Sequence, residues 1–151
     1  SSDLSGRRPG PVHCRPGSAA VTGEGPLIFL IAGEPSGDLL GARLMAALKR
    51  RAGGPVRFAG IGGERMIAEG LDTLFPLHEL SLMGIAELVP KLPNLIRRLA
   101  QTAAEIRRLR PDVVVTIDAP DFCFRIAKRL KGQGIPFVHY VAPSVWAWRR
   151  R

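Results

Sequence analysis

The 151-residue chain is short of cysteine and aromatic residues and has no long hydrophobic run. Its two cysteines, Cys14 and Cys123, are too few for a disulfide framework or a metal cluster and suit a reducing compartment. Three scattered histidines, His13, His78 and His139, show no metal-ligand spacing. No apolar run approaches the ~18 residues that span a bilayer. The shortages therefore exclude a disulfide-stabilised module, a cysteine and histidine metal site and a membrane-spanning helix.

Positive charge is in excess, with a formal net charge of +9. The segment from Lys91 to Arg110 holds six basic residues against one glutamate, and the chain ends in three arginines. Basic helices attract nucleic acid, anionic lipid or phosphorylated substrates without distinguishing among them. A solvated helix face explains any single one of these residues, so charge alone assigns no partner.

The two ends of the chain differ from its middle. Residues 1–25 are rich in glycine, proline, serine and arginine, and we expect a disordered tail there, without the apolar core of a signal peptide. Residues 26–151 suffice for one domain with a hydrophobic core. Because the chain does not begin with methionine and runs into its last arginines without a stop signal, we expect a fragment of a longer protein.

Short apolar runs alternate with amphipathic helical patterns through residues 26–151. The predicted strands are Leu27–Ala32, Val56–Gly60, a weaker Leu71–Leu77, Val113–Ile117 and Ile135–Val141. The predicted helices are Leu39–Arg51, Glu64–Ala68, a basic helix between Pro93 and Pro111, and Phe122–Lys131. This alternation predicts an α/β domain with a mostly parallel sheet and right-handed crossovers. The loops 33–38, 60–63, 118–121 and 142–148 should meet at the carboxyl edge of that sheet.

Asp118 ends the most strongly apolar of these strands, Val113–Ile117. Such a run is typical of a strand buried on both faces, where a charge is costly, so Asp118 should lie where the strand emerges. In open α/β sheets this edge binds ligands. Two interpretations remain open: Asp118 performs chemistry there, or it merely ends the strand while Asp121 caps the next helix.

The loop Gly33–Asp38 lies between the first strand and its helix. A helix that begins after such a loop presents N–H groups suited to a phosphate, a carboxylate or a sugar hydroxyl. Glu34 and Asp38 would repel a bare phosphate, so hydroxyl recognition or acid/base chemistry fits them better. The alternative is that Ser36 or Asp38 caps the helix and Glu34 is solvated.

The segment Ser81–Pro90 is apolar and precedes the basic helix. An exposed apolar patch beside arginine and lysine is typical of a membrane-surface contact. The candidate contact residues are Leu82, Met83, Ile85, Leu88 and Val89. The helix itself carries an apolar stripe that should pack on the sheet, formed by Leu92, Leu95, Ile96, Leu99, Ala103 and Ile106. Its other surface should carry Arg97, Arg98, Arg107 and Arg108.

Four stretches together carry a resemblance to a known family. They are Ala32–Asp38, Met83–Glu87, Ile117–Phe122 and His139–Trp148. In order and spacing they resemble the lipid-A-disaccharide synthase family, from Leu27 to the C-terminus. The resemblance implies a Rossmann-like parallel sheet flanked by helices, the N-terminal half of a GT-B glycosyltransferase. It also implies that the C-terminal UDP-sugar-binding domain is absent from this chain.

The resemblance implies a reaction of lipid A biosynthesis. The family transfers 2,3-diacylglucosamine from UDP-2,3-diacylglucosamine to 2,3-diacylglucosamine 1-phosphate (lipid X), giving lipid A disaccharide 1-phosphate and UDP. No cofactor or metal is implied. The expected location is cytoplasmic, with peripheral association with the inner membrane of a Gram-negative bacterium, which strengthens the membrane interpretation of Leu82–Val89. The isolated fragment should be inactive.

The resemblance also implies roles for individual residues. Asp118 matches the general base that takes the proton from the 6-hydroxyl of the acceptor, and Glu34 matches a supporting carboxylate in the same site. The expected substrate-binding residues are Gly33, Ser36, Gly37, Asp38 and Ser144. Cys123 departs from the polar asparagine expected in many relatives.

Two other functions remain as alternatives. A nucleotide-binding Rossmann-type enzyme is disfavoured because no G-x-G-x-x-G sequence follows Ile31. A basic, non-catalytic nucleic-acid-binding domain has the charge for it but no recognised motif.

Overall fold

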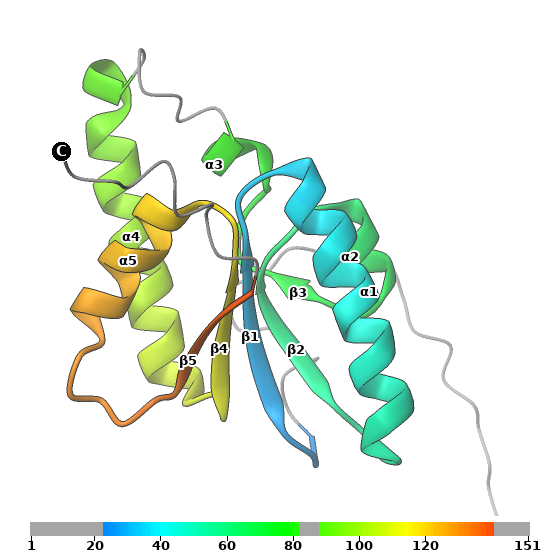
Figure 1. The fold of residues 1–151 in the computed structure, drawn as a ribbon. Coiled ribbons are helices and arrows are strands. Elements are labelled where there is room, and N and C mark those ends of the chain that lie inside the picture. Colours follow the sequence, from blue (N-terminus) through cyan, green and yellow to red (C-terminus); the bar gives the residue numbers. More distant parts are fainter. Residues whose placement is uncertain (1–22, 82–87, 141–151) are drawn as a thin grey trace, which may run out of the picture.

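The computed structural model describes residues 23–81 and 88–140, with side chains described outside 81–92. These residues form a five-stranded sheet in which every pair of neighbouring strands is parallel (Figure 1). The strand order is β3-β2-β1-β4-β5. The strands are β1 (Leu27–Ala32), β2 (Arg57–Ile61), β3 (Asp72–Thr73), β4 (Val113–Ile117) and β5 (Phe137–Tyr140). The predicted Rossmann-like α/β class is confirmed.

Helices cover both faces of the sheet (Figure 1). They are α1 (Pro35–Ala52), α2 (Glu64–Ala68), α3 (His78–Ser81), α4 (Leu88–Leu109) and α5 (Pro120–Arg129). The first two lie on one face, and α4 and α5 lie side by side on the other. Parallel strands need such crossovers, which bury both faces of the sheet.

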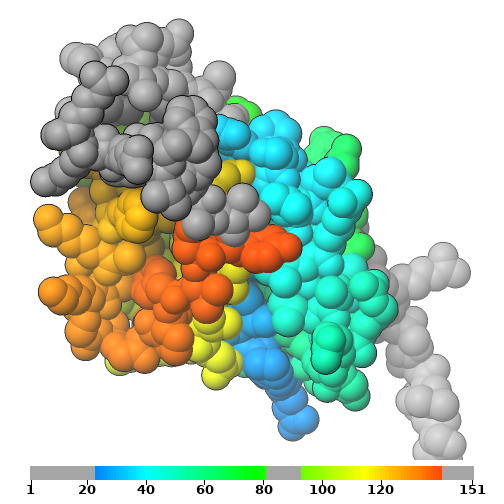
Figure 2. All heavy atoms as spheres, in the orientation of Figure 1, coloured from blue at the N-terminus to red at the C-terminus, as the bar shows by residue number. Residues whose placement is uncertain are grey.

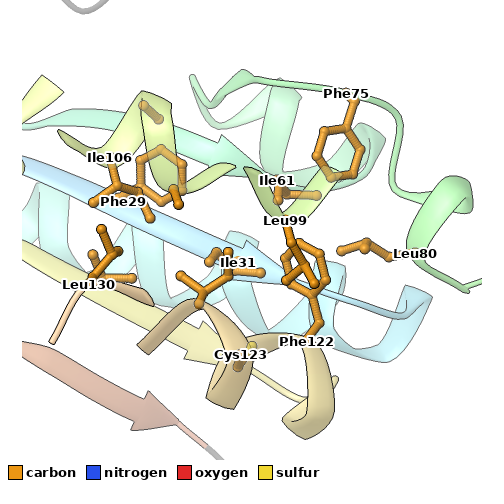
Figure 3. Packing of buried hydrophobic residues seen from close by; sticks show 14 of the residues in the cluster. Phe29, Ile31, Ile61, Phe75, Leu80, Leu99, Ile106, Phe122, Cys123 and Leu130 are labelled. Carbon is orange, nitrogen blue, oxygen red and sulfur yellow. The ribbon is translucent and has the colours of Figure 1, made fainter. Parts of the chain in front are cut away.

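Strand β1 is the centre of the sheet, and all six of its residues are buried. Its side chains alternate, so that Phe29 and Ile31 join the core beneath α4 and α5, whereas Leu30 joins the core beneath α1. Figure 3 shows Phe29 and Ile31 packed with Ile106, Leu99 and Phe122 from the two covering helices. Full burial of each such side chain contributes about 1.5–3 kcal/mol.

Helix α4 packs with a different rotation from the one expected. Leu95, Leu99, Ala103 and Ile106 are buried as predicted, but Ile96 is 50% exposed and leaves the predicted stripe. Arg98, expected on the outer surface, is partly buried. Its guanidinium donates to the Glu79 carboxylate at 2.6 and 2.7 Å and lies 4.6 Å from the centroid of the Phe75 ring. The Arg98 side chain thus lies against Glu79 and Phe75, and the Ile96 side chain faces outward.

The helix caps that the sequence left open as alternatives are not formed. Helix α1 begins at Pro35, four residues before the expected start, and Glu34 occupies its N-cap position without a side-chain capping bond. Helix α5 likewise begins at Pro120, with Ala119 at the N-cap, so Asp121 lies exposed in the first turn and does not cap it. In both cases proline occupies the first helical position, where its fixed φ and missing N–H cost nothing.

The two edges of the sheet are unequal. Strand β3 is only two residues long, shorter than the predicted Leu71–Leu77. Strand β5 forms the other edge, where Val138 is 50% exposed, and Figure 2 shows this strand at the surface between α5 and α1. Within the described ranges, no helix is both long enough and apolar enough to cross a membrane.

Candidate functional site

The carboxyl ends of β1 and β4 form the topological switch point of the sheet. The chain proceeds from β1 to β2 and β3 on one side, and β4 and β5 follow on the other side of β1. Ligands of open α/β sheets bind in the crevice that such a reversal creates. Because Ala32 pairs with Ile117, the residues that follow them, Gly33 and Asp118, leave the sheet next to each other.

Asp118 has a strained backbone. Its φ is 49° and that of Ala119 is 43°, so two successive non-glycine residues adopt the left-handed conformation. Such conformations cost about 1–3 kcal/mol each and gather at functional sites. The turn allows α5 to begin at Pro120, directly after the strand, while the Asp118 side chain reaches across to the loop after β1.

Two glycines, Gly33 before α1 and Gly37 in its first turn, contact the Asp118 turn. The Gly33 N–H donates to Asp118 Oδ1 at 2.8 Å. A Cβ atom on Gly37 would lie 2.2 Å from Asp118 Oδ2, and one on Gly33 would lie 2.1 Å from the Ala119 Cβ. Neither glycine can therefore carry a side chain without displacing the Asp118 turn. Gly33 and Gly37 were predicted to bind substrate, and their contacts in this structure are with Asp118 and Ala119.

The surroundings of Asp118 make its carboxylate more basic. Burial raises the pKa of Asp118 to about 6, against the lowering effect of the Gly33 N–H. The nearby Glu34 carboxylate raises the pKa further, and the N–H groups of Gly37 and Glu34 lower it. Of these donors Gly33 makes the one hydrogen bond with good geometry, and Asp118 Oδ2 is buried without a partner among the described residues. One oxygen is thus held by the Gly33 N–H, and the other is buried against Gly37 without a hydrogen-bond partner among the described residues.

Glu34 and Ser36 are exposed at the N-terminus of α1. Glu34 occupies the N-cap position of α1, and its carbonyl accepts from the Asp38 N–H at 3.0 Å. The N-terminus of α1 offers positive potential that favours an anion. In this structure that anion is the protein's own Asp118 carboxylate, so the helix terminus does not stand open to a phosphate.

Asp38 has a different role from Asp118. It is 6% exposed, and its carboxylate accepts hydrogen bonds from the N–H groups of Gly63, Arg65 and Met66 at 3.0, 3.1 and 3.0 Å. Asp38 therefore caps α2 and fixes the loop after β2, although the sequence indicated a cap for its own helix. This contact between distant segments holds the first turn of α1 against the loop that follows β2, at the carboxyl edge of the sheet.

Sequence reasoning gave no role to a polar pair beneath Asp118. Thr116 Oγ1 lies 2.7 Å from His139 Nδ1, and the His139 ring stacks on Phe124 with centroids 6.3 Å apart. The Cys123 thiol donates to the Asp118 carbonyl at 3.5 Å, and burial raises the pKa of this thiol to about 12, which keeps it protonated. His139 was visible in the sequence, but only the sheet register places it opposite Thr116.

Several predicted residues lie outside the described residues. Ser144, Leu82, Met83 and Ile85 are among them, and Leu88 and Val89 start α4 with side chains that are not described. Among the residues that are described, no group of three histidine, cysteine, aspartate or glutamate side chains could hold a metal ion.

Comparison with known proteins agrees with the fold and with the motifs. A family model described as lipid-A-disaccharide synthetase matches residues 28–151. The chain is 60% identical over 125 residues to the lipid-A-disaccharide synthase of Rhodospirillum centenum, covering 82% of this chain and 31% of the relative. It is also 60% identical over 125 residues to that of Paramagnetospirillum magneticum (82% and 32%), and 51% identical over 142 residues to that of Ruegeria pomeroyi (93% and 34%).

The chain spans about a third of the length of these curated relatives. Within that third, the family model extends over the whole described sheet except its first residue, Leu27. The resemblance carried by the four sequence motifs is thereby confirmed, and the chain belongs to the lipid-A-disaccharide synthetase family.

Proposed function

We propose that this chain supplies the acceptor-binding domain and the catalytic base of a lipid-A-disaccharide synthase. The observation that carries the proposal is the Asp118 carboxylate, seated at the switch point with one buried oxygen that has no partner among the described residues and a pKa raised to about 6. A carboxylate of this basicity is ionised near neutral pH and accepts a proton more readily than an ordinary aspartate.

The proposed step is a direct displacement at the donor sugar. The 6-hydroxyl of lipid X gives its proton to the Asp118 carboxylate while its oxygen forms a bond to the anomeric carbon of UDP-2,3-diacylglucosamine. The bond from that carbon to the UDP oxygen breaks, and UDP leaves with its electron pair. Asp118 then returns the proton to solvent. Proton removal by a positioned base contributes about 10²–10⁴-fold to such a reaction.

The neighbouring residues serve the same step in this proposal. Glu34 keeps Asp118 basic through like-charge repulsion and positions the sugar hydroxyls from the exposed side of the loop. Ser36, also exposed, offers its hydroxyl to the acceptor. Gly33 and Gly37 contribute by holding the Asp118 carboxylate in position. Ser144, outside the described residues, stays a proposed substrate contact on the strength of its motif.

The two alternative functions fit the geometry less well. A dinucleotide places its pyrophosphate at the helix terminus that follows the first strand. In this structure the Asp118 carboxylate occupies that position and Glu34 stands beside it, so a pyrophosphate would meet two negative charges. For a nucleic-acid-binding domain, the positive charge of the chain remains the one supporting observation.

We propose further that the protein is cytoplasmic and meets the inner membrane surface through Leu82, Met83, Ile85, Leu88 and Val89. The support among the described residues is Ile96, which is 50% exposed on α4 beside the exposed Arg97. An apolar side chain next to a cation suits an anionic lipid surface. Replacing Met83 and Leu88 with serine should weaken binding to anionic vesicles, whereas Val138→Ser on β5 should not. Equal binding by both variants would count against the patch.

The proposed reaction can be tested in a chimera. Residues 28–151 of this chain would replace the matching segment of the Rhodospirillum centenum relative, which is 60% identical. Supplied with UDP-2,3-diacylglucosamine and lipid X, the chimera should form the disaccharide 1-phosphate and UDP. A folded chimera that binds both substrates yet makes no disaccharide would refute the proposed function.

A further inference from the structure

A cavity of about 460 Å³ opens beside the first turn of α1, on the side of β2 and α2. Its walls come from that turn, from the loop after β2 and from the segment that leads into α3. Small-molecule pockets typically have volumes of about 300–1,000 Å³. The cavity is large enough for part of a substrate, and the proposed chemistry at Asp118 does not use it.

The interior of this cavity is apolar. Pro35, Ile67, Pro76 and Leu77 supply hydrocarbon surface from three separate segments. The carboxylate of Asp38 also lies in the wall, but it already accepts three backbone hydrogen bonds and so does not attract a cation or a hydroxyl. A ligand that enters the cavity therefore gains mainly from removing apolar surface from water.

The cavity and Asp118 share the first turn of α1. Pro35 and Asp38 line the cavity, whereas Gly33 and Gly37 touch the Asp118 turn. One helical turn rises about 5.4 Å, so the two places lie within the reach of one acylated sugar. A sugar whose hydroxyl faces Asp118 can direct a hydrocarbon substituent past Pro35 toward Leu77.

We propose that this cavity binds one acyl chain of the acceptor while the sugar ring lies against Asp118. The inference rests on the proposed function and adds a subsite to it. The volume of the cavity limits the chain, and the half-buried side chains of Ile67 and Leu77 contact it and set which acyl length fits best. The exposed side chains of Glu64, Arg65 and His78 line the mouth, where the polar part of the acceptor emerges.

The test measures how tightly the 151-residue chain binds a series of N-acylated glucosamine 1-phosphates, from acetyl to octanoyl. Binding is measured by calorimetry at probe concentrations below those at which the probes aggregate. Each added methylene should tighten binding about fourfold until the cavity is full. Ile67→Trp fills the cavity without removing a core residue, and it should reduce the octanoyl affinity to that of the acetyl probe. Leu77→Ser should weaken the increase of affinity with acyl-chain length.

Val138→Ser is the matched control, because it removes a half-exposed apolar side chain from β5, at the opposite edge of the sheet from β3. It should leave the chain-length dependence unchanged. A wild-type chain without any length dependence would overturn the inference, and so would a folded Ile67→Trp variant that keeps it. If that variant keeps the dependence while the chimera makes disaccharide, the cavity assignment fails and the proposed function stands. If the Ile67→Trp variant loses the chain-length dependence but the chimera is inactive, the proposed function fails and the cavity assignment stands.

Discussion

Acidification should slow the chimera by an amount that follows from the pKa of Asp118. With a pKa of about 6, about nine-tenths of the Asp118 carboxylates are ionised at about pH 7 and about a tenth at about pH 5. Because only the ionised form can accept the acceptor's proton, kcat/KM should fall about tenfold across this interval. An aspartate with an ordinary pKa of about 3.9 would stay ionised and give almost no change.

The assay is disaccharide formation at low substrate concentration, since the pH dependence of kcat/KM reports the pKa values of the free enzyme. Glu34→Gln provides a directional control. The Glu34 carboxylate raises the pKa of Asp118, so its removal should move the midpoint of the profile to lower pH. A wild-type profile that stays flat down to about pH 5 would refute the proposed link between burial, basicity and rate.

Three further predictions concern the site and its support. Gly37→Ala should lower transfer at least tenfold, because its Cβ would lie 2.2 Å from Asp118 Oδ2. Gly54→Ala is the control and should have no effect, because its Cβ would meet nothing within 4 Å. Equal activity of the two variants would contradict the role of Gly37 in positioning Asp118. Asp38→Ala should lower the free energy of unfolding by about 3 kcal/mol in urea titrations, since three N–H groups at the carboxyl edge lose their acceptor, and a loss below ~1 kcal/mol would contradict this role. The raised pKa of Asp118 also predicts that its stabilising contribution is complete below about pH 4 and is lost as the pH rises through about 6. The full shift corresponds to ~3 kcal/mol and solvent screening reduces it to ~1–2 kcal/mol, a decline that Asp118→Asn should abolish in unfolding measurements at several pH values.

The strands and the ligand-binding edge were predictable because they depend on local pattern. The β-branched run of β4 and the apolar run of β1 specify buried strands wherever they occur, and parallel connection then brings the loops that follow them together. Asp118 was placed correctly at the end of its strand for this reason. Its left-handed backbone was not predicted, because only a few per cent of non-glycine residues adopt that conformation and neither position is a glycine.

The roles of Asp38 and Arg98 depend on contacts between distant segments. Asp38 accepts from residues 25 to 28 positions away along the chain, and no local signal distinguishes this contact from a cap on its own helix. The rotation of α4 was missed for a related reason. Leu95 and Ile96 are both apolar in the sequence, and the burial of Leu95, the exposure of Ile96 and the contact of Arg98 with Glu79 depend on how α4 packs against distant segments.

The central claim is that Asp118 takes the proton in the transfer step, and turnover of Asp118→Asn in the chimera tests it most directly. Asparagine keeps the size and an acceptor for the Gly33 N–H but cannot accept the proton. Asp121→Asn, three residues away in the same motif and exposed, is the matched control. We expect a loss of about 10²–10⁴-fold in kcat for Asp118→Asn, with acceptor binding retained and the Asp121 variant near wild type. Turnover of Asp118→Asn within about threefold of wild type would contradict it, since that is far below the contribution expected of a general base.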